Sequence, residues 1–245
     1  MPESKKVILF IFEGVTEKIA LESILKKLFA SNHVDVEFIG TDITSNKDIT
    51  VGNIDNELRQ FIREKLKPLH IDVSDIEKII HVIDTDGGFV DERYIKYSAQ
   101  QTHLAYTQNE ILTKDPANTL KRNKEKTEKT NHLKNLSYLH FKSENDLHVP
   151  YQLYYFSRNR EHALQNEVRE LTVIEKKDMA FEFASKYLGK ESDFFTLLND
   201  PAVKVDGSFG QTWSFIQKDN NSLHRHSNFY LAFEDSVKFS SQFRI

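Results

Sequence analysis

Apolar runs that alternate with amphipathic segments constrain the fold of this chain more than any other feature. Residues 7–12, VILFIF, contain no polar residue, which is typical of a strand covered on both faces in a parallel sheet. Between Thr16 and Phe29 the apolar residues recur at helical spacing, and Thr16 is the expected N-cap. The first 30 residues therefore predict a buried strand followed by an amphipathic helix.

The same alternation continues along the chain. Residues 34–43 are expected to form a second strand, residues 54–69 a second helix, and residues 79–83 a third strand. This order predicts a parallel sheet with right-handed crossovers and helices on both faces. With residues 151–156, YQLYYF, as a further strand, we expect an α/β, Rossmann-like fold with a sheet of about four strands.

The remaining segments are expected to elaborate this domain. Residues 121–134 carry six Lys or Arg against two Glu, so residues 114–142 are predicted to be an exposed basic insertion. The last third contains a helix-forming segment, residues 178–188, and no Pro/Gly linker. This favours a mainly helical C-terminal extension, residues 171–245, that packs on a domain of residues 1–170.

Composition excludes several classes of chemistry. The 245 residues contain no cysteine, which excludes disulfides, zinc thiolate sites, iron-sulfur clusters and thiol nucleophiles. Lys and Arg total 33 against 37 Asp and Glu, a net charge of -4, so any nucleic-acid contact must be a local patch. The apolar run before Glu13 is too short for a signal-peptide core or a membrane span, so we expect a cytoplasmic protein without membrane contact.

Two pairs of carboxylates follow the first and third expected strands. Glu13 ends the first strand and Glu17 lies in the first turn of the helix, with Gly14 allowing the tight bend between them. Asp84 and Asp86 are two residues apart at the end of the third strand, so they share a face if strand geometry persists. Ligands of open α/β sheets bind at the carboxyl ends of the strands, where we expect both pairs.

Carboxylates gathered at one sheet edge would repel each other and raise their own pKa values unless a cation neutralised them. Oxygen ligands without His or Cys favour Mg²⁺ or Mn²⁺, partly hydrated and shared with a phosphate. We therefore predict that Glu13, Glu17, Asp84 and Asp86 bind Mg²⁺ or Mn²⁺. The alternative for each pair alone is a solvated strand end or an ordinary turn.

Two short segments, each after an apolar strand, resemble the motifs of a known domain family. Residues 12–17, FEGVTE, and residues 83–87, IDTDG, resemble the two motifs of the Toprim domain. The Glu-x-x-x-Glu spacing is similar to that of OLD-type nucleases rather than primases. In its size the chain resembles small stand-alone Toprim effectors of the RloB and AbiL types. The resemblance covers roughly the first 90 residues and extends to the strand at residues 151–156.

This resemblance implies a Mg²⁺-dependent endonuclease that cleaves DNA or RNA, with tRNA among the candidates. By resemblance, Glu13 takes acid/base and metal roles, Asp84 and Asp86 hold Mg²⁺, and Glu17 is a further ligand. The family's setting implies an anti-phage, abortive-infection effector. The chain has no Gly-Lys-Ser/Thr sequence of a P-loop, so a separate ATPase or sensor protein is the expected partner. A homodimer is left open.

Further polar residues follow the strand at residues 151–156. Arg158 could hold a scissile phosphate and His162 could transfer a proton, or both belong to a surface turn and helix start. Asn159 stands where OLD-type nucleases have a further acidic residue, and Glu161 comes two residues later. This departure leaves the number of metal ions, one or two, open.

Basic residues outside the motifs offer contacts to nucleic acid. Arg225 belongs to a polar loop, residues 220–228, that either contacts phosphates or is solvated. In the basic insertion the candidate contacts, or else parts of a solvated face, are Lys121, Arg122, Lys124 and Lys126.

Two other functions compete with the nuclease. One is a Toprim-like module that binds nucleic acid or a protein without cleaving. The other is a phosphatase of the HAD type, because residues 84–87 also resemble its Asp-x-Asp-Gly signature. That signature normally follows the first strand, whereas here it follows the third, and it leaves Glu13 and Glu17 without a role.

Overall fold

The computed structural model describes residues 6–29, 35–142 and 146–233. The chain folds into two compact units. The first unit comprises Met1–Val82, Glu128–Leu153 and Ala180–Glu191, and the second comprises Ile83–Thr127, Tyr154–Met179 and Ser192–Ile245. The predicted division at residue 170 stays a prediction, and residues 234–245 of the predicted C-terminal extension lie outside the described residues.

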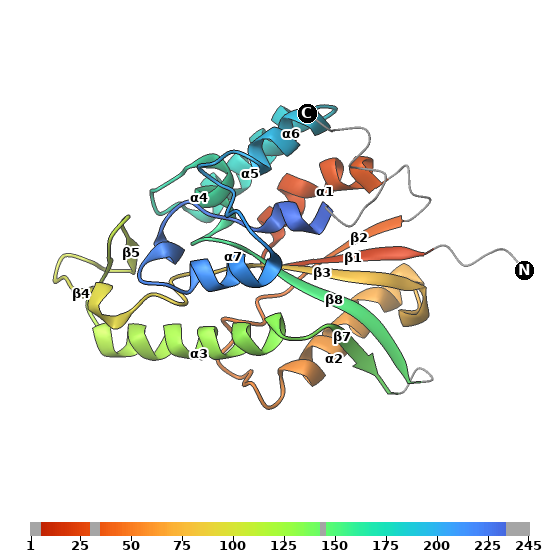
Figure 1. Cartoon of the computed structure of the whole chain (residues 1–245), viewed down its shortest axis with the longest axis horizontal. Coiled ribbons are helices and arrows are strands. Elements are labelled where there is room, and N and C mark those ends of the chain that lie inside the picture. Colours follow the sequence, from red (N-terminus) through yellow and green to blue (C-terminus); the bar gives the residue numbers. More distant parts are fainter. Residues whose placement is uncertain (1–5, 30–34, 143–145, 234–245) are drawn as a thin grey trace, which may run out of the picture. The chain divides into compact units, whose positions relative to one another are not determined.

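A five-stranded sheet with the order β2-β1-β3-β8-β7 organises the first unit (Figure 1). Its strands are β1 (Val7–Phe12), β2 (Asp35–Gly40), β3 (Ile76–Asp84), β7 (Tyr138–Phe141) and β8 (Leu147–Phe156). β1 pairs in parallel with β2 and β3, whereas β7 is antiparallel to β8. The predicted α/β class with a mostly parallel sheet is confirmed. The sheet has one strand more than expected because β7 pairs with β8. Val34, the expected start of the second strand, lies outside the described residues.

Helices cover both faces of this sheet, as the alternation predicts. α1 (Val15–Phe29) and α2 (Ile54–Leu66) lie on opposite faces (Figure 1), which is what right-handed crossovers from β1 to β2 and from β2 to β3 require. α1 begins at Val15, so the expectation that Thr16 is its N-cap is wrong: Thr16 lies inside the first turn.

The core beside β1 is aromatic. All six residues of β1 are buried, and the rings of Phe10 and Phe12 stack on Phe38 of β2 with centroids 5.5 and 6.2 Å apart. Burying a phenylalanine side chain stabilises a fold by roughly 1.5–3 kcal/mol. This packing anchors the strand immediately before Glu13.

The second unit has a small sheet of its own, with the order β4-β6-β5, and several short helices. Its elements are β4 (Ile95–Tyr97), β5 (Ala105–Tyr106), β6 (Ile111–Thr113), α4 (Arg160–Gln165), α6 (Glu191–Leu198) and α7 (Phe209–Ile216). α5 (Val173–Tyr187) contributes residues to both units. Trp213 of α7 is buried, with its ring centroid 4.9 Å from that of Tyr155.

The predicted basic insertion is a helix, α3 (Pro116–Lys134), and one of its faces is buried. Lys126 and Lys129 are each 4% exposed, whereas Lys121 and Lys124 are exposed. The expectation that the whole insertion is exposed is therefore wrong. Polar partners offset the free-energy cost of burying these lysines. The Lys129 ammonium donates to the backbone carbonyl of Asn46 at 2.8 Å.

The polar segment at residues 220–228 is tied into the second unit. The Ser222 hydroxyl donates to the carbonyl of Gly88 at 2.8 Å, and the His226 backbone N–H donates to the Ser157 hydroxyl at 2.7 Å. Asn228 is fully buried and accepts a hydrogen bond from the Tyr155 N–H. The alternative of a solvated loop is therefore wrong. Among the described residues no helix has the length and apolar character needed to cross a membrane.

Candidate functional site

The glutamate pair lies in the first unit, where β1 passes into α1. The hydroxyl of Thr44, a fully buried residue, donates a hydrogen bond to Glu13 Oε1. Glu17 is 5% exposed, and its Oε1 accepts a hydrogen bond from the Thr16 hydroxyl at 3.2 Å. Hydroxyl groups thus orient both carboxylates.

Gly14 has a steric role in this region. A Cβ atom at Gly14 would lie 2.5 Å from Glu17 Oε2, so the glycine leaves the space that this carboxylate occupies. The φ angle of Gly14 lies outside the left-handed region. The expected tight bend is also present, because the chain bends at Glu13 and Gly14 between β1 and α1.

The aspartate pair has a different backbone from the one expected. β3 ends at Asp84, and Asp86 follows it with a φ of 45°. Strand geometry therefore does not persist from Asp84 to Asp86, and alternation along a strand cannot place the two side chains on one face. Gly87 continues the turn with a φ of 80°, a conformation that glycine adopts without strain.

Basic and phenolic groups hold Asp86 within the second unit. The Lys126 ammonium lies 2.7 Å from Asp86 Oδ2. The guanidinium of Arg122 and the hydroxyl of Tyr106 both donate to the backbone carbonyl of Asp86, at 2.6 and 2.9 Å. Burial raises the pKa of Tyr106, and the neighbouring charge of Asp86 raises it further, so the phenol stays protonated. Asp86 therefore has a cationic partner on a nearly buried lysine.

Arg158 is coupled to Asp86 through the backbone. The Asp86 N–H donates to the carbonyl of Arg158 at 2.9 Å, and the Arg158 N–H donates to the Thr85 hydroxyl at 2.8 Å. Arg158 has a φ of 55°, so two non-glycine residues joined by a hydrogen bond are both left-handed. Such conformations concentrate at functional sites. The Arg158 side chain is 3% exposed, and its guanidinium lies 5.2 Å from the ring centroid of Tyr106.

The other residues predicted after β8 are engaged within the second unit. Glu161, 2% exposed, forms an ion pair at 2.8 Å with Arg160, which is fully buried. The Arg225 Nε donates at 2.9 Å to the carbonyl of Ala163, where α4 ends. Burial lowers the pKa of His162 to about 4, and the charge of Arg158 lowers it as well. The expected helix start is confirmed, because α4 begins at Arg160 with Asn159 as its N-cap, but the expected surface location is wrong for Glu161 and His162, which are buried.

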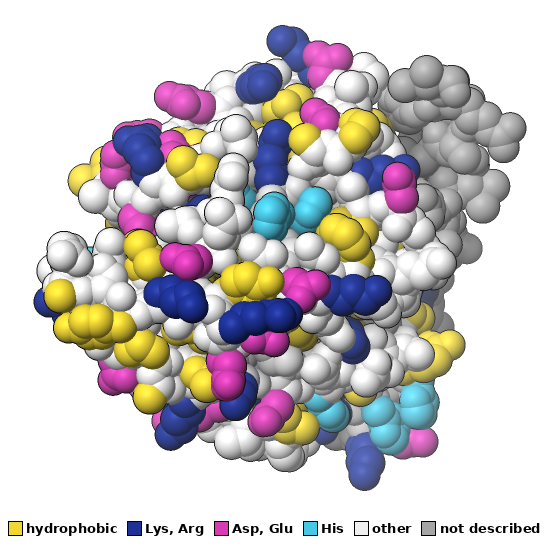
Figure 2. All heavy atoms as spheres, turned by 60° about the vertical axis from the view of Figure 1, so that its left-hand side comes forward, with side chains coloured by type: hydrophobic (Ala, Val, Ile, Leu, Met, Phe, Trp, Pro, Cys, Tyr) yellow, Lys and Arg dark blue, Asp and Glu magenta, His cyan; other side chains and the backbone are white. Residues whose placement is uncertain are grey.

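The four candidate nucleic-acid contacts on α3 divide into two sets. Lys121 and Lys124 are exposed, whereas Arg122 and Lys126 contact Asp86. Figure 2 shows a face of the molecule on which Lys and Arg side chains are interspersed with Asp and Glu. Only the exposed lysines of this group can contact a nucleic acid without rearrangement.

Sequence reasoning missed two residues of this region. Thr44 follows β2, so the rule that selects Glu13, a polar residue after a strand's carboxyl end, could have selected it too. Tyr106 carries no such signal, because its contact with Asp86 depends on the small sheet of the second unit.

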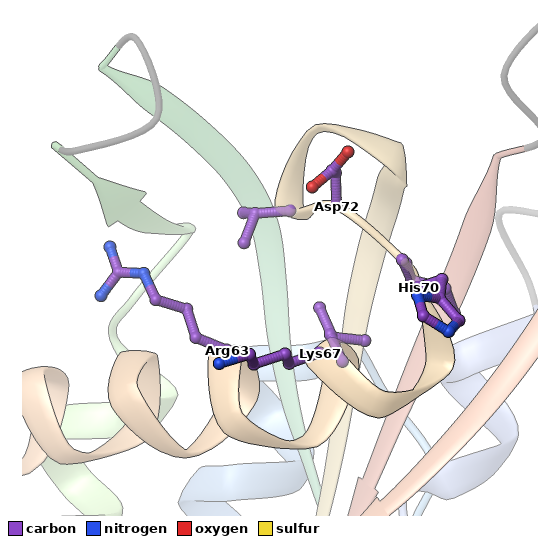
Figure 3. Close-up of a pocket in the computed structure, with 7 residues that line it drawn as sticks. Arg63, Lys67, His70 and Asp72 are labelled. Atoms are coloured by element: carbon purple, nitrogen blue, oxygen red, sulfur yellow. The ribbon is translucent and has the colours of Figure 1, made fainter.

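A pocket of about 450 Å³ lies elsewhere in the first unit (Figure 3). It is formed where α2 continues through a short 3-10 turn, η2 (Lys67–Leu69), towards the amino end of β3. Figure 3 labels Arg63 and Lys67 from the helical side and His70 and Asp72 from the segment that follows. No predicted site residue lines this pocket, so it adds nothing to the carboxylate site.

The candidate site thus has two described parts. The first unit holds Glu13 and Glu17 with hydroxyl donors, and Asp86 in the second unit has the basic partners Lys126 and Arg122. In comparisons with protein-family models, curated proteins and solved structures, nothing matches this chain.

Proposed function

We propose that this chain is a Mg²⁺-dependent nuclease that hydrolyses phosphodiester bonds of DNA or RNA. The observation that carries the proposal is the parallel pairing of β1 with β3, in which Phe12 lies opposite Val82. Glu13 follows Phe12 directly, and Asp84 comes two residues after Val82. Motif carboxylates that follow neighbouring parallel strands at their carboxyl ends occur where ligands bind in such sheets.

The donor set fits a hard cation. Glu13, Glu17, Asp84 and Asp86 offer carboxylate oxygens only, which suits Mg²⁺ or Mn²⁺. A bound Mg²⁺ would polarise a phosphoryl oxygen and lower the pKa of a coordinated water. In this proposal Glu13, oriented by Thr44, accepts or donates the proton, and the other three carboxylates are ligands.

The basic residues take supporting roles. Lys121 and Lys124 contact the nucleic-acid backbone, since they are exposed. Arg158 positions Asp86 rather than the phosphate, because its side chain is 3% exposed and its backbone accepts a hydrogen bond from the Asp86 N–H. The Toprim resemblance adds a separate ATPase or sensor protein as partner, and abortive infection as the setting.

One observation favours a second function, a Toprim-like module that binds nucleic acid without cleaving it. Asp86 is already paired with Lys126 at 2.7 Å. A lysine in contact with a carboxylate can replace the positive charge of a metal ion, and a site neutralised in this way needs no cation.

A cleavage assay separates these functions. Purified protein is incubated with plasmid DNA, single-stranded DNA and total tRNA in Mg²⁺, Mn²⁺ or EDTA. We expect metal-dependent cleavage that falls by about 100-fold or more in Glu13→Gln and Asp84→Asn. Glu22→Gln is the matched control, because Glu22 lies on α1 and pairs with Lys26 at 2.7 Å. Binding without cleavage in every metal condition would favour the non-catalytic module.

A second experiment asks whether the glutamates and the aspartates hold one ion together. Mg²⁺ affinity is measured for Glu17→Gln, for Asp84→Asn and for the double variant. If both residues bind the same ion, the losses in binding free energy are not additive, whereas independent sites give additive losses. Additive losses would contradict a shared metal centre.

A further inference from the structure

A pair of histidines faces outward from the antiparallel strands β7 and β8. His140 lies directly opposite His148 in the register of these strands. Their neighbours Leu139 and Val149 are each 1% exposed, so the opposite face of the pair is packed in the core. Residues directly opposite each other in an antiparallel pair have Cβ atoms about 4.5–5.5 Å apart. The register therefore brings two imidazole rings together on the exposed face.

Ring contacts orient these two side chains. The rings of His140 and His148 stack with centroids 4.1 Å apart and planes 10° from parallel. The ring of Tyr138 meets His148 edge to face, with centroids 6.4 Å apart. The imidazoles are thus held side by side, although His148 is exposed.

A carboxylate completes the cluster. Asp146 Oδ1 lies 2.7 Å from His140 Nε2. One ligand atom from each of His140, Asp146 and His148 can be chosen so that all three lie within 4.8 Å of one another. Within either unit of the described chain, no other group of three His, Asp or Glu side chains gathers in this way.

We propose that His140, Asp146 and His148 form a binding site for Zn²⁺ or a similar first-row transition metal. Imidazole nitrogen is a ligand for such ions, whereas Mg²⁺ selects oxygen ligands. Zn²⁺ binds imidazole nitrogen at about 2.0–2.1 Å and carboxylate oxygen at about 2.0–2.2 Å. Asp146 and His148 are exposed, so their side chains have room to move to these distances.

Three protein ligands leave the fourth tetrahedral position to water or to a group from another molecule. The ion would link β7, the edge strand of the sheet, to β8. This site is separate from the carboxylates after β1 and β3 and does not depend on the proposed nuclease activity.

The same chain contains a matched comparison for this cluster. His132 Nε2 lies 2.8 Å from Asp55 Oδ1, and the side chains of His132 and His140 are both 31% exposed. Among the described residues of the first unit, no third potential ligand joins the pair of His132 and Asp55 in such a cluster. It therefore serves as the control for Zn²⁺ binding by a half-exposed His–Asp pair that has no second imidazole.

The test is a Zn²⁺ titration of the full-length protein without a histidine tag, followed by calorimetry. The variants are His140→Ala, His148→Ala and Asp146→Asn, with His132→Ala as the matched control. Co²⁺ replaces Zn²⁺ in a parallel titration, because its visible spectrum reports nitrogen ligands and tetrahedral geometry directly.

We expect one Zn²⁺ per chain in the wild type. Loss of either histidine should weaken binding by at least about 100-fold, since even the loss of a group that only supports a ligand costs about 10- to 100-fold. His132→Ala should bind Zn²⁺ as the wild type does. No Zn²⁺ binding by the wild type, or equal binding by His148→Ala and the wild type, would overturn the proposal.

Hydrogen exchange provides a second readout that does not depend on the stoichiometry. Bound Zn²⁺ should slow amide exchange in β7 and β8 of the wild type and leave it unchanged in His148→Ala. Circular dichroism and thermal unfolding without metal should show that the variants fold, because His148 is exposed. Equal protection of both proteins by Zn²⁺ would contradict the site.

Discussion

The two acidic pairs differ in what surrounds their charge. In the first unit, Glu13 and Glu17 accept hydrogen bonds from the neutral hydroxyls of Thr44 and Thr16. In the second unit, Asp86 contacts the ammonium of Lys126. A hydroxyl orients a carboxylate and leaves its charge in place, whereas a lysine compensates that charge. Asp86 must therefore exchange its ammonium partner before it can bind a metal cation.

This difference shows that a motif carboxylate is not a metal ligand by its position alone. Glu161 also follows a strand, but it is 2% exposed and pairs with the fully buried Arg160. Glu161 therefore neutralises the buried charge of Arg160. This ion pair is more deeply buried than the ion pair of Asp86 with Lys126.

Breaking the ion pair of Arg160 and Glu161 should have the largest effect. Glu161→Gln removes the carboxylate that pairs with the buried guanidinium of Arg160, so we expect a loss of about 3 kcal/mol in the free energy of unfolding. Denaturant unfolding measures this loss of stability. Glu167→Gln is the control, because Glu167 pairs with the exposed Arg169 and solvent screens that pair. Equal losses in the two variants would show that burial does not set the energy of these pairs.

Removing the cation beside Asp86 should have the next largest effect. Lys126→Met keeps most of the side-chain length and removes the charge. We expect the free energy of unfolding to fall by about 2 kcal/mol, less than for Glu161→Gln because Asp86 is only partly buried. Mg²⁺ should restore more stability in Lys126→Met than in the wild type, since the ion can take the place of the ammonium. Thermal unfolding with and without Mg²⁺ tests this. An identical Mg²⁺ response in both proteins would contradict the exchange of partners.

The cationic surroundings of the second unit also predict a pH dependence. His162 has a pKa of about 4 in the folded protein against 6.5 for an ordinary histidine, because it is buried beside Arg158. The unfolded chain binds the proton first, so stability is lost as the pH falls from 6.5 to 4. The full shift corresponds to about 3 kcal/mol, and solvent screening reduces it to about 1–2 kcal/mol. His162→Gln should lose stability less steeply over this range in denaturant unfolding. An unchanged slope would exclude His162 as the source.

The next prediction concerns the glutamate pair and the Thr44 hydroxyl that donates to Glu13. Thr44→Val preserves the shape of the side chain and removes the hydrogen bond to Glu13, at a cost of about 1 kcal/mol. Its effect on Mg²⁺ affinity should exceed that of Thr50→Val, since the Thr50 hydroxyl donates to Asn53 and not to a proposed metal ligand. Calorimetry with Mg²⁺ measures the difference. Equal affinities would mean that Thr44 does not orient a metal ligand.

The smallest effect on stability is expected on the exposed face of α3. Lys121→Gln and Lys124→Gln should change the free energy of unfolding by less than about 0.5 kcal/mol. They should still weaken nucleic-acid binding and reduce its salt dependence, because each removes a charge that can meet a phosphate. Binding at several salt concentrations checks this. An unchanged salt dependence would remove α3 from the proposed nucleic-acid surface.

Much of the fold was readable from local pattern. The apolar runs predicted β1 and parts of β3 and β8, because a strand buried on both faces must be apolar along its length. The same reading placed Glu13 and Asp84 at strand ends, which the structure bears out.

The pattern was least informative for α3 and for the β7–β8 pair. The buried face of α3 includes Lys126 and Lys129, so a rule that expects apolar residues on a buried face cannot find it. The pairing of His140 with His148 depends on a register between strands, and β7 was not among the expected strands.

The sequence by itself determined the α/β class, the order of the first strands and the carboxylates that follow them. These depend on hydrophobic periodicity and on neighbours in the chain. Only the tertiary structure decided which partner each charge receives: a hydroxyl for Glu13, a lysine for Asp86 and an arginine for Glu161. Buried polar groups must find partners, and for Glu13 and Asp86 the partner comes from a segment 31 or 40 residues away, where no local pattern can specify it.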